Sequence, residues 1–159
     1  MRAGHNSIVF VLLVTLLSSC HTTQSERTST SEDRTLITSE SLGRIAGMQW
    51  TLRKMTIDGQ QYKLADERPF IKFENDGKLS GFASINRFFG SMQIDNQGAV
   101  KWTAPFGSTK MAGPPELMQQ EDSFLDALQK TERLSTERIY LYLQNSDGRT
   151  ELVLYVPVK

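Results

Sequence analysis

The sequence predicts a mainly β domain, an antiparallel and small barrel-like sheet with one α-helix packed against it. Three observations lead to this fold class. Short segments between residues 50 and 156 alternate apolar and polar side chains, as strands with one face toward a core do. Asn, Asp and Gly clusters separate many of these segments, which is typical of hairpins. One stretch, residues 114 to 130, instead places apolar residues at helical spacing.

The strands are predicted in order from their alternation. The first contains Trp50 and Leu52 and ends at Asp58-Gly59. Two hairpins follow, each a strand, a turn and a returning strand: residues 71–73, 75–77 and 79–83, then residues 92–94, 96–98 and 100–102. The last hairpin is the clearest, because Ile139, Leu141 and Leu143 share one face before the 146–148 turn, and residues 152–156 return.

The helix is predicted from Pro114 or Pro115 to Lys130. Prolines suit its first turn, Glu116 and Lys130 complement its dipole, and the helix is expected to lie across or plug the sheet. Its apolar stripe, which we interpret as core packing, consists of Leu117, Met118, Phe124, Leu125 and Leu128.

The first residues predict export. Arg2 precedes an apolar run, residues 8–17, which is too short to span a bilayer but suits a secretory signal. The run ends in Leu17-Ser18-Ser19-Cys20, which resembles the lipobox of bacterial lipoproteins. The resemblance implies a signal peptide over residues 1–19 and acyl chains, such as palmitate, on Cys20. The alternative is an ordinary signal peptide with an incidental cysteine.

A lipid-anchored location follows from that resemblance. Two or more acyl chains would hold the chain on the membrane without spanning it. His21 stands where an aspartate would favour retention at the inner membrane, so we expect the periplasmic face of the outer membrane. Residues 20–44 are rich in Ser and Thr and predict a flexible tether, and the folded domain is expected over residues 45–159.

Composition excludes several classes of function. Removing residues 1–19 takes away only Arg2, which leaves 17 basic and 18 acidic side chains and no sign of nucleic-acid binding. The two histidines are His5 and His21, and no cysteine follows Cys20. The domain therefore lacks the usual general base, nucleophile pairs and zinc ligands, so we expect no catalytic residue, no metal and no cofactor.

Carboxylate chemistry is the surviving enzymatic possibility, since glycosidases need only two acids. The candidate acids Glu116, Glu121, Asp122 and Asp126 all lie on the predicted helix, where we interpret them as a solvated face. The Asn and Asp clusters at residues 75–77 and 95–98 lack the ligand spacing of calcium loops and are interpreted as turns.

Four motifs carry a family resemblance. They are Trp50-x-Leu52, the segment from Gly81 to Ser91, the segment Thr109-Lys110-Met111-Ala112-Gly113-Pro114, and Met118-x-x-Glu121-x-x-Phe124-Leu125-x-Ala127-Leu128. In this order they resemble the META domain of HslJ-like heat-shock lipoproteins, over roughly residues 47–157. The resemblance implies a small β fold with a helix, an envelope location, and a role in heat shock or antibiotic tolerance. It implies these structural or binding residues: Gly81, Asn86, Arg87, Phe88, Gly90, Thr109, Lys110, Met111 and Glu121.

The chain departs from the family pattern at two positions. Many relatives have cysteine where this chain has Ile85 and Gly113. Because both cysteines are absent together, we expect these two residues to be neighbours, with the isoleucine filling the space beside the glycine.

Two interpretations of Asn86-Arg87 stay open. In the structural one, Asn86 satisfies backbone groups in a turn, Arg87 pairs with a carboxylate such as Glu121, and Phe88 and Phe89 divide between core and rim. In the functional one, Arg87, Lys110 and the aromatic rim recognise an anionic or peptide ligand.

The leading functional hypothesis is a monomeric, non-enzymatic binding or stability module, anchored to the membrane through Cys20 and acting in envelope stress on an envelope protein or peptide. The alternatives are a lipocalin-like carrier of a small ligand, a pilotin-like peptide-binding lipoprotein, and a carboxylate-based cell-wall hydrolase.

Overall fold

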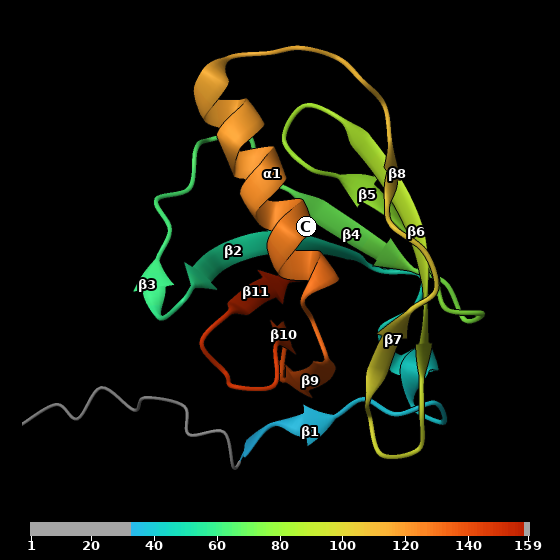
Figure 1. The fold of residues 1–159 in the computed structure, drawn as a ribbon. Coiled ribbons are helices and arrows are strands. Elements are labelled where there is room, and N and C mark those ends of the chain that lie inside the picture. Colours follow the sequence, from blue (N-terminus) through green and yellow to red (C-terminus); the bar gives the residue numbers. More distant parts are fainter. Residues whose placement is uncertain (1–32, 158–159) are drawn as a thin grey trace, which may run out of the picture.

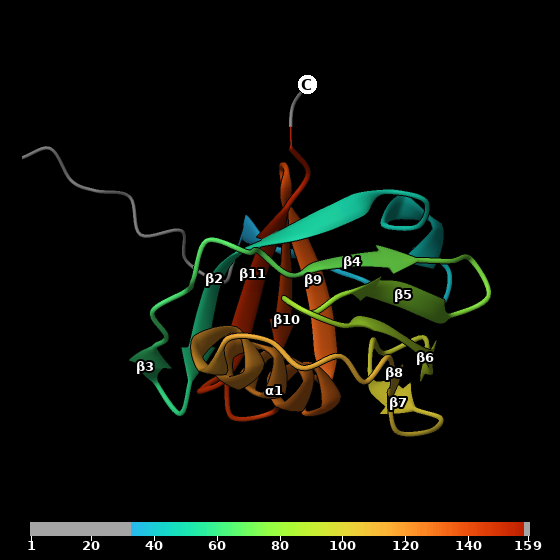
Figure 2. The same cartoon turned by 90° about the horizontal axis from the view of Figure 1, so that it is seen from above.

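The computed structural model describes residues 33–157 of the chain. The predicted signal peptide, Cys20 and most of the predicted tether lie outside these residues. Within them, one antiparallel sheet curls around a core and a single α-helix covers its concave side (Figures 1 and 2). The predicted fold class is confirmed.

The strands pair in the order β1-β9-β10-β11-β2-β4-β5-β6-β7, with β3 added to β2 and β8 added to β6. Their bounds are β1 Thr35–Leu36, β2 Gln49–Ile57, β3 Gln60–Gln61, β4 Phe70–Phe73, β5 Lys78–Phe82, β6 Arg87–Ile94, β7 Val100–Trp102, β8 Gly107–Ser108, β9 Arg133–Glu137, β10 Tyr140–Gln144 and β11 Glu151–Tyr155. The three predicted hairpins are β4-β5, β6-β7 and β10-β11.

The sheet is barrel-like but not closed, because its end strands β1 and β7 do not pair with each other. Backbone hydrogen bonds nevertheless bridge the gap. Ser39 N donates to Asp95 O, in the turn after β6, at 3.1 Å, and Val100 N of β7 donates to Glu132 O, just before β9, at 2.9 Å. Gly98 in this turn has φ +79° and lies against Leu36 and Ile37. A side chain there would be strained in backbone and would meet both residues.

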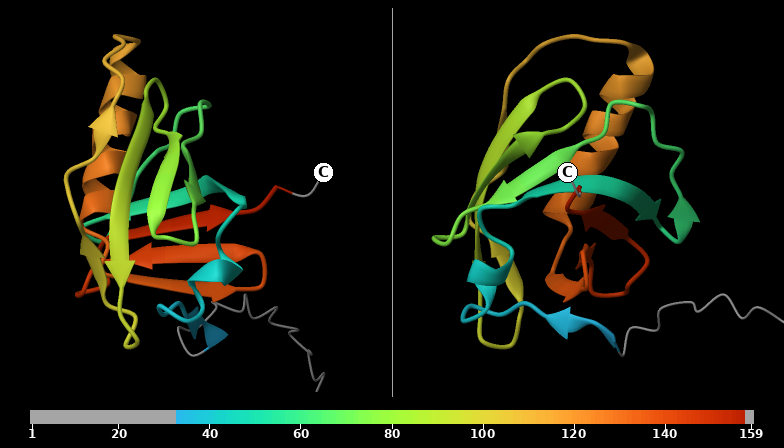
Figure 3. Two further views of the ribbon diagram at one scale, coloured as in Figure 1. Left: turned by 90° about the vertical axis from the view of Figure 1, so that its right-hand side faces the viewer. Right: turned by 180° about the vertical axis from the view of Figure 1, so that it is seen from behind.

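Helix α1 spans Pro115–Gln129, as predicted, with Glu116 in its first turn. Its buried residues are Gln120, Glu121, Phe124, Ala127 and Leu128. Three of them, Phe124, Ala127 and Leu128, form one hydrophobic core with the inward side chains of the sheet. Figure 3 shows α1 running along the concave side of the sheet. Leu117, Met118 and Leu125 of the predicted stripe are only partly buried, so the helix is rotated toward two polar residues that the stripe did not include.

Contrary to expectation, the folded domain does not begin near Ile45, because described residues before it already belong to the fold. Strand β1 pairs with β9, Ile37 is completely buried, and its amide donates to Leu134 O at 2.8 Å. A short 3-10 helix, η2 Leu42–Arg44, buries Leu42 before β2 begins. Few apolar residues suffice here because the sheet edge supplies backbone partners and a preformed core surface.

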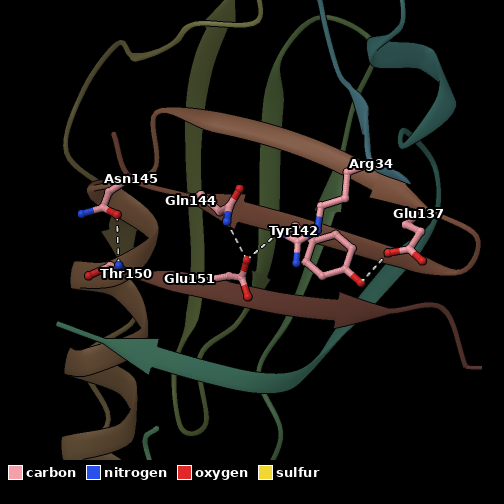
Figure 4. A network of polar contacts seen from close by, with 7 residues as sticks. All are labelled: Arg34, Glu137, Tyr142, Gln144, Asn145, Thr150 and Glu151. Atoms are coloured by element: carbon pink, nitrogen blue, oxygen red, sulfur yellow. Dashed lines mark hydrogen bonds and ion pairs between the residues drawn. The ribbon is translucent and has the colours of Figure 1, made fainter. Parts of the chain in front are cut away.

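Arg34 fastens this segment to the outward face of the sheet (Figure 4). Its guanidinium carbon lies 3.5 Å from the Tyr142 ring centroid, and its Nη1 lies 2.7 Å from Glu151 Oε2. Tyr142 also donates from its hydroxyl to Glu137 Oε2 at 3.2 Å. The side chains of Arg34 and Glu151 are mostly buried, so salt screens this ion pair less than it would an exposed one.

Alternation misassigned two residues of the last hairpin. Ile139, expected on the core face, is 46% exposed, whereas Tyr142 on the opposite face is 6% exposed. Ile139 falls in the tight turn between β9 and β10, before the strand begins at Tyr140. Strand β9 was not predicted either, although it pairs with β10 along its whole length. Tyr142 is buried because Arg34 stacks on it, a contact across more than one hundred residues of sequence.

Candidate functional site

The bend between β5 and β6 presents Asn86, the residue that the sequence places in an apolar neighbourhood. Its side chain is 3% exposed. Oδ1 accepts hydrogen bonds from Thr109 Oγ1 and from the Met111 amide, both at 2.8 Å. Nδ2 donates to Met111 O at 3.1 Å and to Glu121 Oε1 at 2.8 Å. Four bonds use the full capacity of an amide side chain, which leaves none for a ligand.

Glu121 reaches this bend from α1. Its Oε2 accepts from the amides of Asn86 at 2.7 Å and Ile85 at 3.2 Å, and its Oε1 accepts from Asn86 Nδ2. The residue is 6% exposed, so its interpretation as part of a solvated face is wrong. Asp122 and Asp126 are exposed, as expected. Three N–H donors replace the water that a buried carboxylate loses.

The predicted pairing of Arg87 with Glu121 is also wrong. Arg87 is exposed on the outward face of β6, and its backbone amide donates to Thr109 Oγ1 at 3.1 Å. Strand alternation explains the difference, because Asn86 ends the bend facing α1 while the next residue points to the other face. The side chain that pairs with the Glu121 carboxylate is therefore the amide of Asn86 and not a cation.

The two phenylalanines divide as predicted between core and surface. Phe88 is 1% exposed and makes edge contacts with Phe106 and Phe124 at centroid distances of 5.7 and 5.9 Å. Phe89 is 64% exposed on the outward face. This part of the structural interpretation is confirmed.

The motif glycines make room for these rings. A Cβ on Gly81 would lie 2.1 Å from Phe70 O and 2.6 Å from the Phe88 ring. A Cβ on Gly90 would lie 2.5 Å from the Phe106 ring. Both distances are below any real Cβ contact, so the two glycines permit close packing of aromatic rings on the sheet.

Ile85 and Gly113 are neighbours, as predicted. A Cβ built on Gly113 would lie 2.4 Å from Ile85 Cδ1. The isoleucine side chain therefore occupies the space beside the glycine, and the segment before α1 packs directly on the bend.

Sequence reasoning missed Gln120, which is completely buried. Its Nε2 donates to Ser84 Oγ and to Glu67 O, each at 2.7 Å, and its Oε1 accepts from Ala65 N at 2.7 Å. Ser84 is a non-glycine residue with φ +112°, a backbone conformation that this contact helps to hold. A signal was present, since Gln120 lies four residues before Phe124 and so on the same helix face.

An open hollow with a volume of about 530 Å³ lies beside this network, between α1 and the loop that leads to it. Asn86 and Glu121 form its floor, and its rim includes Lys110, Asp122 and Asp126. Met111 also lines it and is 56% exposed. Arg87 is not among the residues that line the hollow, so the structure does not combine it with Lys110 in one pocket.

The side chains of the hollow suit contact with a partner better than acid–base catalysis or metal binding. Its carboxylates are Glu121, which is occupied by three N–H groups, and the two exposed aspartates. Within residues 33–157, no group of three His, Cys, Asp or Glu side chains is placed to hold a metal ion. No helix in that same range is both long and apolar enough to cross a membrane.

Comparison with solved structures supports the fold. The chain is similar to a protein from Burkholderia xenovorans solved by NMR, with a TM-score of 0.61 and 19% identity over 76% of this chain and 89% of that one. It is also similar to a DUF4847 family protein from Bacteroides vulgatus solved by crystallography, with a TM-score of 0.54 and 15% identity over 72% of this chain and 96% of that one. At these identities the likeness shows the fold alone.

No curated protein matches the chain. A protein-family comparison does match it, to the META domain over residues 43–155. That range contains the bend at Asn86, the loop at Thr109 to Met111 and the whole of α1, so the residues of the polar network lie inside the matched region. The chain belongs to the META domain family.

Proposed function

We propose that this protein is a non-enzymatic, lipid-anchored component of the bacterial envelope that acts in stress tolerance by binding a partner at the hollow beside Asn86. The observation that supports it is that the polar groups around this hollow are of two kinds, those bonded within the protein and those exposed to solvent. The network of Asn86 and Glu121 is satisfied internally, so it serves to hold the loop against α1. The exposed side chains of Lys110, Met111 and Asp122 remain for contact with a partner.

The chemistry of the rim favours a peptide segment of an envelope protein, as in the pilotin-like hypothesis. Met111 supplies a flexible apolar contact that is 56% exposed. Lys110 and Asp122 supply charges of both signs around it, whereas Asp126 is already paired with Lys130 Nζ at 2.7 Å. An extended peptide can use both kinds of contact, because it presents apolar side chains and polar backbone groups together.

The carrier hypothesis has less support. The concave side of the sheet, where a lipocalin-like ligand would sit, is filled by core residues of the strands and α1, among them the completely buried Phe73 and Phe124. The hollows found among the described residues open on the surface and are lined by many polar side chains.

Two experiments test the proposal separately. For anchoring, Cys20→Ser should release the protein from the membrane fraction into the soluble periplasm and abolish metabolic labelling with a palmitate analogue. Unchanged membrane association together with unchanged labelling would contradict the anchor.

For binding, a photo-crosslinking amino acid at Lys110 should capture a defined envelope protein in living cells. The same amino acid at the exposed Gln60, in β3, is the control. Met111→Ser should reduce capture from the Lys110 position. Equal capture from both positions, or capture that Met111→Ser leaves unchanged, would contradict binding at the hollow.

A further inference from the structure

The charges of this domain are segregated in a way that its near-zero net charge conceals. Strands β2, β4, β5 and β6 contain no Asp or Glu. Within these strands the basic residues are Arg53, Lys54, Lys72, Lys78 and Arg87, and all five are exposed. Their inward positions are apolar and buried, so the cations gather on the outward face of the sheet.

The strand register places aromatic rings among these cations. Phe70 pairs with Phe82, and Phe82 pairs with Arg87. One row further along, Lys72 pairs with Ser80, which pairs with the 64% exposed Phe89. The rings of Phe70 and Phe82 stack at 6.1 Å. We name Arg53, Phe70, Lys72, Phe82, Arg87 and Phe89 the basic aromatic face.

A β-bulge extends this face at β2. Val153 pairs with Lys54 and Leu154 with Leu52, so Arg53 is the extra residue and both cations are exposed. A hollow with a volume of about 430 Å³ at the bulge is lined by Arg53, Lys54 and Arg68 and by no carboxylate.

These cations are available for an external anion. Lys78 pairs with Asp76 at 2.6 Å, but within residues 33–157 no ion pair involves Arg53, Lys54, Lys72 or Arg87. The domain's acidic helix lies on the other side of the sheet (Figures 2 and 3). The exposed carboxylates Glu116, Asp122 and Asp126 therefore point away from the face.

We propose that the basic aromatic face docks on an anionic lipid surface. Phosphate headgroups complement the unpaired cations, each of which strengthens binding about fivefold near such a surface. The exposed ring of Phe89, with the partly exposed rings of Phe70 and Phe82 beside it, can enter the boundary between headgroups and acyl chains. The outward strand face is open to solvent, and the hollow at its bulge, lined by Arg53, Lys54 and Arg68, can receive a phosphate headgroup. This arrangement turns the hollow beside Asn86 away from the membrane.

The proposed anchor is compatible with this orientation. Cys20 lies 13 residues before Asp33, and an extended chain of that length reaches at most about 45 Å. An anchored domain would thus stay close enough to the membrane for weak contacts to form repeatedly. The docking itself does not depend on acylation, and its test uses protein without lipid.

The test measures vesicle binding of the chain from residue 20 onward, carrying Cys20→Ser. The protein should co-sediment with vesicles of mixed phosphatidylglycerol and phosphatidylcholine, and it should stay in the supernatant with vesicles of phosphatidylcholine alone. Lys72→Glu/Arg87→Glu should weaken binding by about 25-fold or more. Lys63→Glu/Lys130→Glu, on the helix side, changes the net charge equally and should weaken binding less than threefold.

A fluorescent reporter checks which face makes contact. With anionic vesicles, the Phe89→Trp variant should show a shift of its fluorescence emission to shorter wavelength, whereas Ile139→Trp, also at an exposed position, should not. Binding that is absent, or equal for the two charge-reversed variants, would overturn the proposal. So would loss of binding on adding sodium phosphate at matched ionic strength, because that result would mean a site for free phosphate. A failure of docking would leave Cys20 acylation and capture at Lys110 unaffected, so the two proposals fail independently.

Discussion

Replacing Asn86 by alanine is expected to lower the free energy of unfolding by about 3 to 5 kcal/mol. The substitution removes four hydrogen bonds, worth about 1 kcal/mol for each of three neutral partners and about 2 kcal/mol for the Glu121 carboxylate. Thr109 and Met111 are exposed, so water can replace part of this, whereas the buried Oε1 of Glu121 is left without its side-chain donor.

Urea denaturation measures the effect. Trp50 is 3% exposed and Trp102 is partly buried, so their fluorescence should report the unfolding of the domain. Arg87→Ala is the matched control, because Arg87 is the neighbour of Asn86 in the chain and its side chain is exposed. Substitutions at exposed positions usually cost less than about 0.5 kcal/mol. A double-mutant cycle between Arg87 and Glu121 should give a coupling energy near zero.

A charge version of the experiment isolates the contact with Glu121. Asn86→Asp places a second carboxyl within hydrogen-bonding distance of Oε1, and like charges raise the pKa of one of the two groups. A folded-state pKa above the unfolded value means that protonation favours the fold. The deficit of this variant relative to the parent should therefore shrink as the pH falls from about 7 to about 4.

Two results would refute this reasoning. One is a cost for Asn86→Ala below about 1 kcal/mol, or no larger than that of Arg87→Ala, since a fully used side chain cannot be dispensable. The other is an Asn86→Asp variant whose deficit is independent of pH.

Three further predictions concern the packing at Gly81, the contact of Ile85 with Gly113, and the contact of Arg34 with Tyr142. Gly81→Ala should lower the free energy of unfolding, measured by urea denaturation, by at least about 3 kcal/mol, because its Cβ would lie 2.1 Å from the carbonyl oxygen of Phe70. Gly43→Ala, whose Cβ would lie 3.5 Å from Asn75 Oδ1, should cost less than about 1 kcal/mol. Equal costs would contradict the close packing. In a Cys20→Ser background, Ile85→Cys/Gly113→Cys should form an internal disulfide on oxidation, seen as a mass loss of about 2 Da, and free thiols under those conditions would contradict the contact. Arg34→Ala should increase the rate of amide hydrogen exchange in β1 at least tenfold while β4 to β6 stay protected. Unchanged exchange would mean that the contact of Arg34 with Tyr142 does not hold β1 on the sheet.

Local pattern was sufficient for much of this fold. The hairpins around residues 75–77 and 96–98 combine a period of two with a turn sequence, and both signals lie within a dozen residues. The helix was equally readable from its spacing and its prolines. The adjacency of Ile85 and Gly113 was also foreseen, because the family resemblance supplied a pair of positions and not merely a composition.

Contacts between distant segments were harder to foresee. Arg34 and Tyr142 are each unremarkable in sequence, and only the sheet brings a cation over that ring. Ile37 is buried because β9, which was not predicted, offers it a backbone partner. The burial of Glu121 was also not foreseeable from local sequence. Its neighbours Gln119 and Asp122 are polar, so it resembles a solvated acid until the structure shows the N–H groups that donate to it.

The sequence by itself determined the family motifs, the hairpins, the helix and the shortage of catalytic residue types, because each of these depends on residue identity or on spacing along the chain. Tertiary structure alone decided that Asn86, and not its arginine neighbour, receives Glu121, and that unpaired cations share one face of the sheet. The reason is that burial and charge pairing are properties of surfaces that meet in space, and these surfaces come from strands and a helix far apart in the chain.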